Sequence, residues 1–186
     1  MPYLSDDELN SLGFKSLGKN VKISNRASIY NADQMTIGEN SRIDDFCVVS
    51  GKVDIGRNVH IAPLCLVAGG EPGITLHDFS GLAYHAQVFS QSDDYSGTTM
   101  TNPTVPDQFK AEIKSPVTIG RHAIIGSGAV VFPGVHVPEG CSVGALSLVL
   151  VSLEPWSVCV GTPAKRVKAR DRSLLDLEAQ YLKNEK

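Results

Sequence analysis

The chain has 186 residues, which is enough for one domain with an extended core. Its 17 lysines and arginines against 20 aspartates and glutamates give a formal net charge of −3, which argues against general nucleic-acid binding. The first ten residues lack the basic-then-apolar order of a signal peptide, and the longest apolar stretch, around 143–153, is too short to span a bilayer. We therefore expect a cytoplasmic protein.

The first element that we predict is a short helix within residues 1–16. Ser5 and Glu8 have the spacing of a capping box, and Gly13 supplies a stop signal. Repeat proteins need their terminal units covered, so we expect this helix and a second one at the C-terminal end to cap the two ends of the structure between them.

Aliphatic residues then recur at every sixth position over most of residues 21–165. Two runs have no miss: Ile37, Ile43, Val49, Ile55, Ile61 and Val67, then Ile119, Ile125, Val131, Val137, Val143 and Val149. Period six is neither the 3.6 of a helix nor a simple alternation, and it is typical of a parallel β-helix. Each unit is then a short strand plus a corner, and three units make one coil of 18 residues.

The cysteines support this coil length. Cys47 and Cys65 are 18 residues apart, and so are Cys141 and Cys159, so each pair should occupy one column of the coil. No C-x-x-C pair is present, and we expect all four thiols to be reduced and buried.

The largest interruption of the repeat runs from about residue 89 to residue 115. It is polar, contains two prolines and has no clear period, whereas the repeat resumes on both sides. Loops of this length in compact domains are usually functional or disordered. We interpret this one as a protruding functional loop at an acceptor site. The chain closes with a predicted amphipathic helix over residues 171–186, with Leu174, Leu177 and Tyr181 on one face.

The segment "VTIGRHAIIGSGAVVFPGVHVPEGCSVGALSLV", followed by "VCVGTPAKRVKAR", resembles the C-terminal half of hexapeptide-repeat acetyltransferases. These include galactoside O-acetyltransferase and acyltransferases of O-antigen and capsule gene clusters. The resemblance implies a left-handed β-helix, a homotrimer with active sites between subunits, and acetyl-CoA as donor. It also implies a sugar or sugar-nucleotide acceptor in polysaccharide synthesis. An N-terminal nucleotide-binding domain is not seen, which favours O-acetylation over N-acetylation.

Carried over by position, the resemblance places Gly126 and Ser127 along the pantetheine of the donor, with Gly144 and Ala145 one coil later. A linear pantetheine can lie along a column only where the side chains are small. The same positions are also ordinary corner residues of the repeat. A second element is expected to bind the CoA phosphates, because Lys and Arg neutralise phosphate well, although it could be a solvated charge run: Thr162, Lys165, Arg166 and Lys168.

The residue that accepts a proton from the acceptor is less clear. Acyl transfer usually employs a histidine, and galactoside O-acetyltransferase has one in the loop, but residues 89–115 contain none. His85, at a corner just before the loop, is the first candidate, with Asp93 or Asp94 orienting its ring. His60, on an outer strand face, is the second. An aspartate base, or no base, remains open.

The other histidines are weaker candidates. We expect His122 and His136 to be solvent-exposed at outer positions, and His77 has no obvious partner. Two other functions stay open: a non-catalytic assembly subunit, and a metal enzyme like the γ-class carbonic anhydrases. The latter needs three histidine ligands. The only similarly spaced pair is His77 and His85, so we predict no metal site.

Overall fold

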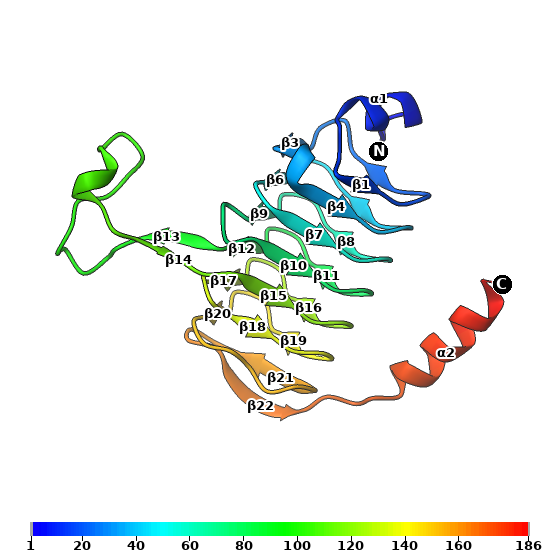
Figure 1. The fold of residues 1–186 in the computed structure, drawn as a ribbon. Helices are drawn as coiled ribbons and strands as arrows, with labels where there is room; N and C mark the ends of the chain where they lie inside the picture. Colours follow the sequence, from blue (N-terminus) through cyan, green and yellow to red (C-terminus); the bar gives the residue numbers. More distant parts are fainter. Residues whose placement is uncertain (1, 186) are drawn as a thin grey trace.

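The computed structural model describes residues 2–185, so the outer ends of the predicted segments 1–16 and 171–186 lie outside the described residues. The described chain winds into a prism with three parallel sheets as its walls, along which successive coils stack (Figure 1). The left-handed parallel β-helix, with one protruding loop and short helices near the termini, is confirmed.

The three walls are built from short strands, one per wall in most coils. Sheet 1 contains β1 (Ser16–Leu17), β4 (Met35–Ile37), β7 (Val53–Ile55), β10 (Ile74–Leu76), β15 (Val117–Ile119) and β18 (His136–Val137). Sheet 2 contains β2 (Lys22–Ile23), β5 (Arg42–Ile43), β8 (His60–Ile61), β11 (Gly81–Leu82), β16 (Ile124–Ile125), β19 (Ser142–Val143), β21 (Ser157–Val160) and β22 (Lys165–Ala169). Sheet 3 contains β3 (Ser28–Tyr30), β6 (Val48–Ser50), β9 (Leu66–Ala68), β12 (Gln87–Phe89), β17 (Val130–Val131) and β20 (Leu148–Val149).

The core lies inside the prism and consists of the residues that recur in sixes. Ile43, Ile61 and Ile125 are at most 1% exposed, and the same holds for Val49 and Val131. Fully burying such a side chain stabilises the fold by about 1.5–3 kcal/mol. All four cysteines are reduced and buried, in agreement with the prediction.

Two corners of the prism carry left-handed backbone, the one between sheets 1 and 2, for example at Asn58 and Phe79, and the one between sheets 2 and 3. Phe46, Leu64, His85 and Leu146 all have left-handed backbone angles there, with φ between 57° and 69°. The apolar side chains among them are nonetheless exposed, Leu146 by 77%. Such a backbone costs roughly 1–3 kcal/mol for a bulky residue and is concentrated at functional sites. Exposed large apolar side chains on such a backbone, Phe46, Leu64 and Leu146, distinguish the corner between sheets 2 and 3.

The predicted loop leaves the prism after β12 and returns at β15. Its two ends pair as an antiparallel hairpin, β13 (Gln91–Asp93) with β14 (Glu112–Lys114), and a short 3-10 helix, η2 (Asp107–Phe109), lies near its tip. Figure 1 shows this hairpin projecting away from the prism. Large apolar side chains are exposed along it: Tyr95, Met100, Phe109 and Ile113. A second 3-10 helix, η1 (Ala32–Gln34), forms a widened corner at the N-terminal end.

The first helix, α1 (Asp6–Ser11), has the predicted capping box: the Glu8 amide donates to Ser5 Oγ at 3.4 Å, and the Ser5 amide donates to Glu8 Oε2 at 2.7 Å. The second helix, α2 (Leu174–Asn184), lies beside the coils, where Tyr181 packs edge-on against Phe79. The expectation that both helices cap the ends of the prism is therefore wrong for α2. The reason is that β22 turns back antiparallel to β21 and covers that end itself.

Across residues 2–185, the structure contains no helix with both the length and the apolar character needed to cross a membrane.

Candidate active site

A column of outward residues follows the corner between sheets 2 and 3. The Gly128 amide donates to the Tyr84 carbonyl at 2.9 Å, and the Leu146 amide donates to the Ser127 carbonyl at 2.9 Å. These bonds stack Tyr84, Ser127 and Ala145 on successive coils, and all three are exposed. We call Tyr84, Ser127 and Ala145 the corner column. Its two C-terminal members have small side chains, as a path for pantetheine requires.

Thr162 lies at the C-terminal end of the corner column. Its hydroxyl donates to the Leu146 carbonyl at 3.2 Å. The structure thus brings together three of the predicted donor-site residues, Ser127, Ala145 and Thr162, in one line along the prism edge.

The two glycines of the predicted donor site have a simpler explanation. A Cβ on Gly126 would lie 2.6 Å from the Ala145 backbone nitrogen, and one on Gly144 would lie 2.7 Å from Val160 Cγ1. Both contacts are far closer than a real Cβ tolerates. Close stacking of the coils therefore requires glycine at both positions, whether or not a ligand passes.

The three basic residues among the predicted phosphate-binding set, Lys165, Arg166 and Lys168, lie on β22, and all are exposed. Lys165 pairs with Val160 of β21, and Arg166 pairs with Cys159. Neighbouring residues of a strand point to opposite faces, so Lys165 and Arg166 face different sides. Arg166 also contacts Glu154 at 3.4 Å. Together with Lys168, these two side chains place positive charge at the C-terminal end of the corner column, on both faces of β22.

His85 is exposed at the corner, next to Tyr84 in the chain. Its amide donates to the Pro63 carbonyl at 3.1 Å, and its ring has no hydrogen bond among the described residues. Asp93 accepts instead from the Asn102 amide at 3.3 Å. The expected orientation of His85 by an aspartate of the hairpin is therefore not seen.

Asp94 is held within the hairpin. It accepts hydrogen bonds from the hydroxyls of Ser96 at 2.7 Å and Thr98 at 2.9 Å. These bonds, with that of Ser96 the largest cause, lower the pKa of Asp94 to about 2. In this structure Asp94 therefore holds the turn over residues 94–99 of the hairpin.

His60 belongs to a polar network on the outer face of sheet 2. Its Nε2 lies 2.7 Å from Asp44 Oδ2 and 2.9 Å from a guanidinium nitrogen of Arg42. Arg42 in turn donates to Asp44 at 3.0 Å, and the Asp44 side chain is only 1% exposed. The sequence analysis found His60 but missed its partners. The available signal was that Arg42 and His60 precede inward isoleucines one coil apart.

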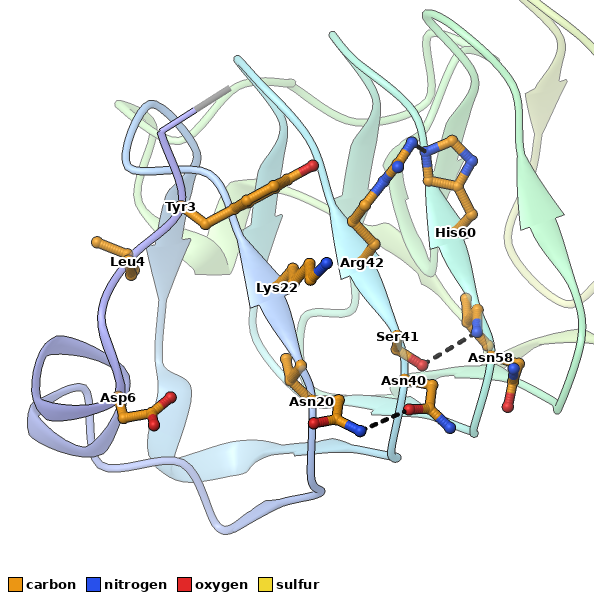
Figure 2. A pocket seen from close by; sticks show the side chains of 12 residues that line it. Tyr3, Leu4, Asp6, Asn20, Lys22, Asn40, Ser41, Arg42, Asn58 and His60 are labelled. Carbon is orange, nitrogen blue, oxygen red and sulfur yellow. Dashed lines mark hydrogen bonds between the residues drawn. The ribbon is translucent and has the colours of Figure 1, made fainter. Parts of the chain in front are cut away.

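An open groove of about 870 Å³ runs over this face, between the N-terminal segment and sheet 2 (Figure 2). The side chains in Figure 2 come from β2, β5, β8, their preceding corners and the N-terminal segment. They are mostly basic or amide groups: Lys22, Arg42, His60, Asn20, Asn40 and Asn58, together with Tyr3, Ser41 and Asp6.

Of the two histidines that we expected to be solvent-exposed, one is exposed and the other is not. His136 is exposed, as predicted. His122 is not, because α2 covers it: its ring stacks on Phe79 with centroids 5.2 Å apart, and its Nε2 lies 3.0 Å from Glu178 Oε2. Within residues 2–185, no three His, Cys, Asp or Glu side chains are grouped so as to hold a metal ion.

Comparison with known proteins identifies the family of this chain. Residues 35–69 match the family described as "Bacterial transferase hexapeptide (six repeats)". Over 184 residues the chain is 42% identical to the dTDP-4-amino-4,6-dideoxy-D-glucose acyltransferase of Escherichia coli, covering 97% of this chain and 95% of that one. The chain belongs to the sugar acyltransferases of the hexapeptide-repeat family.

Solved structures agree. AntD, an N-acyltransferase from Bacillus cereus, in complex with dTDP and 3-hydroxybutyryl-CoA, superposes with a TM-score of 0.97 at 44% identity, covering 99% of this chain and 98% of that one. A maltose O-acetyltransferase from Clostridium difficile shares the fold at 22% identity, with a TM-score of 0.57 over 91% and 79% of the two chains. We predicted an acetyl-CoA-dependent sugar O-acetyltransferase, and the coarser class, an acyl-CoA-dependent sugar acyltransferase, is confirmed.

Proposed function

We propose that this chain transfers an acyl group from acyl-CoA to the amine of a nucleotide-linked amino sugar. The observation that supports this most is the corner column. It places small side chains beside a terminal basic segment, in a chain that resembles AntD and the dTDP-amino-sugar acyltransferase over nearly its whole length. The sequence alone favoured a hydroxyl acceptor. The whole-length relatives named here are an N-acyltransferase and an acyltransferase of an amino sugar, so we now favour the amine.

The donor would lie along the prism edge. Its phosphates would meet Lys165, Arg166 and Lys168 on β22, and its pantetheine would pass Thr162 and the corner column. The thioester would then arrive beside Tyr84 and His85, one coil beyond Ser127. Acetyl is the acyl group that we propose, as the sequence resemblance implies.

Acyl transfer requires that the amine nitrogen attack the thioester carbonyl carbon. The nitrogen must then lose a proton, and the departing CoA sulfur must gain one. His85 is exposed at the point where these atoms would meet, so we propose it as the group that carries this proton. A neutral amine is a better nucleophile than a hydroxyl, which makes a modest base sufficient.

The outer face of sheet 3 supports the expected homotrimer. One outward row of sheet 3 is mostly apolar: Ser28, Val48, Leu66, Gln87, Val130 and Leu148. The corresponding row of sheet 1 is polar: Thr36, Asp54, Thr75 and Thr118. Monomeric proteins rarely expose large contiguous apolar patches. We propose that sheet 3 packs against other copies of the chain, and that the projecting hairpin reaches a neighbouring corner column.

Light scattering during gel filtration tests the assembly. Leu66→Glu should convert a trimer into smaller species, because the charge would be buried in the interface. Thr75→Glu, the matched change on sheet 1, should leave the trimer intact. Equal behaviour of the two variants would contradict the assignment of the interface.

Release of free thiol tests the reaction. With acetyl-CoA, the protein should release CoA in the presence of dTDP-4-amino-4,6-dideoxyglucose and not with dTDP-glucose, which offers only hydroxyls. His85→Ala should lower kcat by about 10²-fold or more with the Kd for CoA unchanged, and His136→Ala should have no effect. No release with either acceptor would favour the non-catalytic alternative. Release with dTDP-glucose alone would restore the hydroxyl acceptor.

A further inference from the structure

Sheet 2 carries a row of basic side chains on its outer face, separate from the corner column. Lys22 pairs in register with Arg42, and Arg42 with His60, so the three side chains are stacked on consecutive coils. The next position in the row is Gly81, which pairs with His60 and has no side chain. We call Lys22, Arg42 and His60 the basic ladder.

The basic ladder is held in place from beneath. Asp44, whose side chain is 1% exposed, contacts Arg42 at 3.0 Å and His60 at 2.7 Å, while these two side chains remain 41% and 45% exposed. The carboxylate is thus covered by the protein, whereas its basic partners face the groove of Figure 2. The Nε of Arg42 is buried and has no hydrogen-bond partner in the described structure.

The other groups of the groove are compatible with a nucleotide. Among the described residues that line it, Asp6 is the one carboxylate, on α1 at the N-terminal side. The corner amides of Asn20 and Asn40 are joined by a hydrogen bond of 3.1 Å, so further amide groups remain available for a base. Lys22 lies over the ring of Tyr3, with Nζ 5.9 Å from its centroid.

The spacing connects the basic ladder to the corner column. Successive coils lie about 4.8 Å apart, the separation of hydrogen-bonded strands. Tyr84 and His85 belong to the same coil as Gly81, so His60 lies about one coil and Arg42 about two coils towards the N-terminus, and the ladder positions lie four residues across sheet 2 from His85. Four residues span at most about 13 Å, so the separation is of the order of a pyranose ring and its phosphate plus the reach of the Arg42 and His60 side chains. A sugar whose amine meets a thioester at His85 would therefore direct its anomeric phosphate towards His60 and Arg42.

We propose that the basic ladder binds the diphosphate of the acceptor, with the sugar lying over the gap left by Gly81. This inference rests on the proposed function, since it takes a nucleoside-diphosphate sugar as the substrate. Guanidinium and ammonium groups are well suited to phosphate oxygens, and the open step at Gly81 leaves room for a ring that a side chain would block.

Titration calorimetry with dTDP and with coenzyme A tests the proposal on the full-length protein. Arg42→Met and Lys22→Met should each raise the Kd for dTDP by at least about tenfold, the usual effect of losing a charged hydrogen bond. The Kd for coenzyme A should stay unchanged and shows that each variant is folded. Arg57→Met is the matched control, because Arg57 faces Glu39 and Glu185 outside this groove.

The possible results separate this inference from the proposed function. If wild-type protein binds dTDP and acylates the amino sugar, but Arg42→Met and Lys22→Met bind dTDP as wild type does, the basic ladder is not the diphosphate site. If both variants lose coenzyme A instead, the ladder serves the donor and the inference is equally overturned. If wild-type protein neither binds dTDP nor acylates the amino sugar, the proposed function fails and the ladder assignment fails with it.

Discussion

The change Gly126→Ala tests how tightly the coils stack at the corner column. The added Cβ would lie 2.6 Å from the carbonyl carbon of Gly144 and from the backbone nitrogen of Ala145, so the next coil would have to move. Overpacking of this kind costs about 1–3 kcal/mol. At roughly 2–4 °C per kcal/mol for a chain of this size, Tm should fall by about 2–12 °C.

Gly81→Ala is the matched control for this prediction. Gly81 is also an outward-facing glycine next to a corner, but its added Cβ would meet only the His60 carbonyl oxygen, at 3.8 Å. Its stability should change by no more than about 1 kcal/mol, and the loss of chain entropy on replacing glycine favours a gain. Both variants should be melted at the same protein concentration by calorimetry, because association shifts Tm. Equal Tm values for the two variants would refute the argument from coil stacking.

Three further predictions follow from the same geometry. Ala145→Trp should raise the Kd for coenzyme A at least tenfold with little change in Tm, since its side chain is exposed; unchanged affinity would remove the corner column from the donor path. Glu178→Ala should speed hydrogen exchange in α2, because it leaves the nearly buried His122 without its partner, and unchanged exchange would show that other contacts hold the helix. The neighbouring Cys47 thiol and burial raise the pKa of the Cys65 thiol, so alkylation at pH 8 should be slow in the folded protein and rapid in denaturant; rapid native alkylation would contradict this core.

The arrangement of the coils could be read from the chain because a β-helix repeats one simple constraint. Each inward position must be apolar. Residues such as Ile43, Ile61 and Ile125 therefore predict the strands of the walls from the local sequence alone. The same reasoning located the column of small residues, since Ser127 and Ala145 are one coil apart. It also located the hairpin, as the place where the period fails.

The outer faces obey no such constraint, and here the three-dimensional structure was needed. Lys22 and Arg42 are 20 residues apart, and His60 and Gly81 are 21 apart, because insertions near residues 31–36 and 69–75 lengthen individual coils. The residues of the basic ladder are therefore paired in register in the sheet, although their spacing in the sequence departs from a constant 18 residues.

The sequence by itself determined the wall positions of the prism, because inward burial imposes one apolar residue on every unit. Only the tertiary structure decided which polar side chains meet. It placed Asp44 beneath Arg42 and His60. It also placed Asp93 on a hairpin that projects from the prism, where Asp93 does not orient His85. Such contacts depend on the length of each side chain and on the position at which each loop leaves the coil. A period of six carries no information about either.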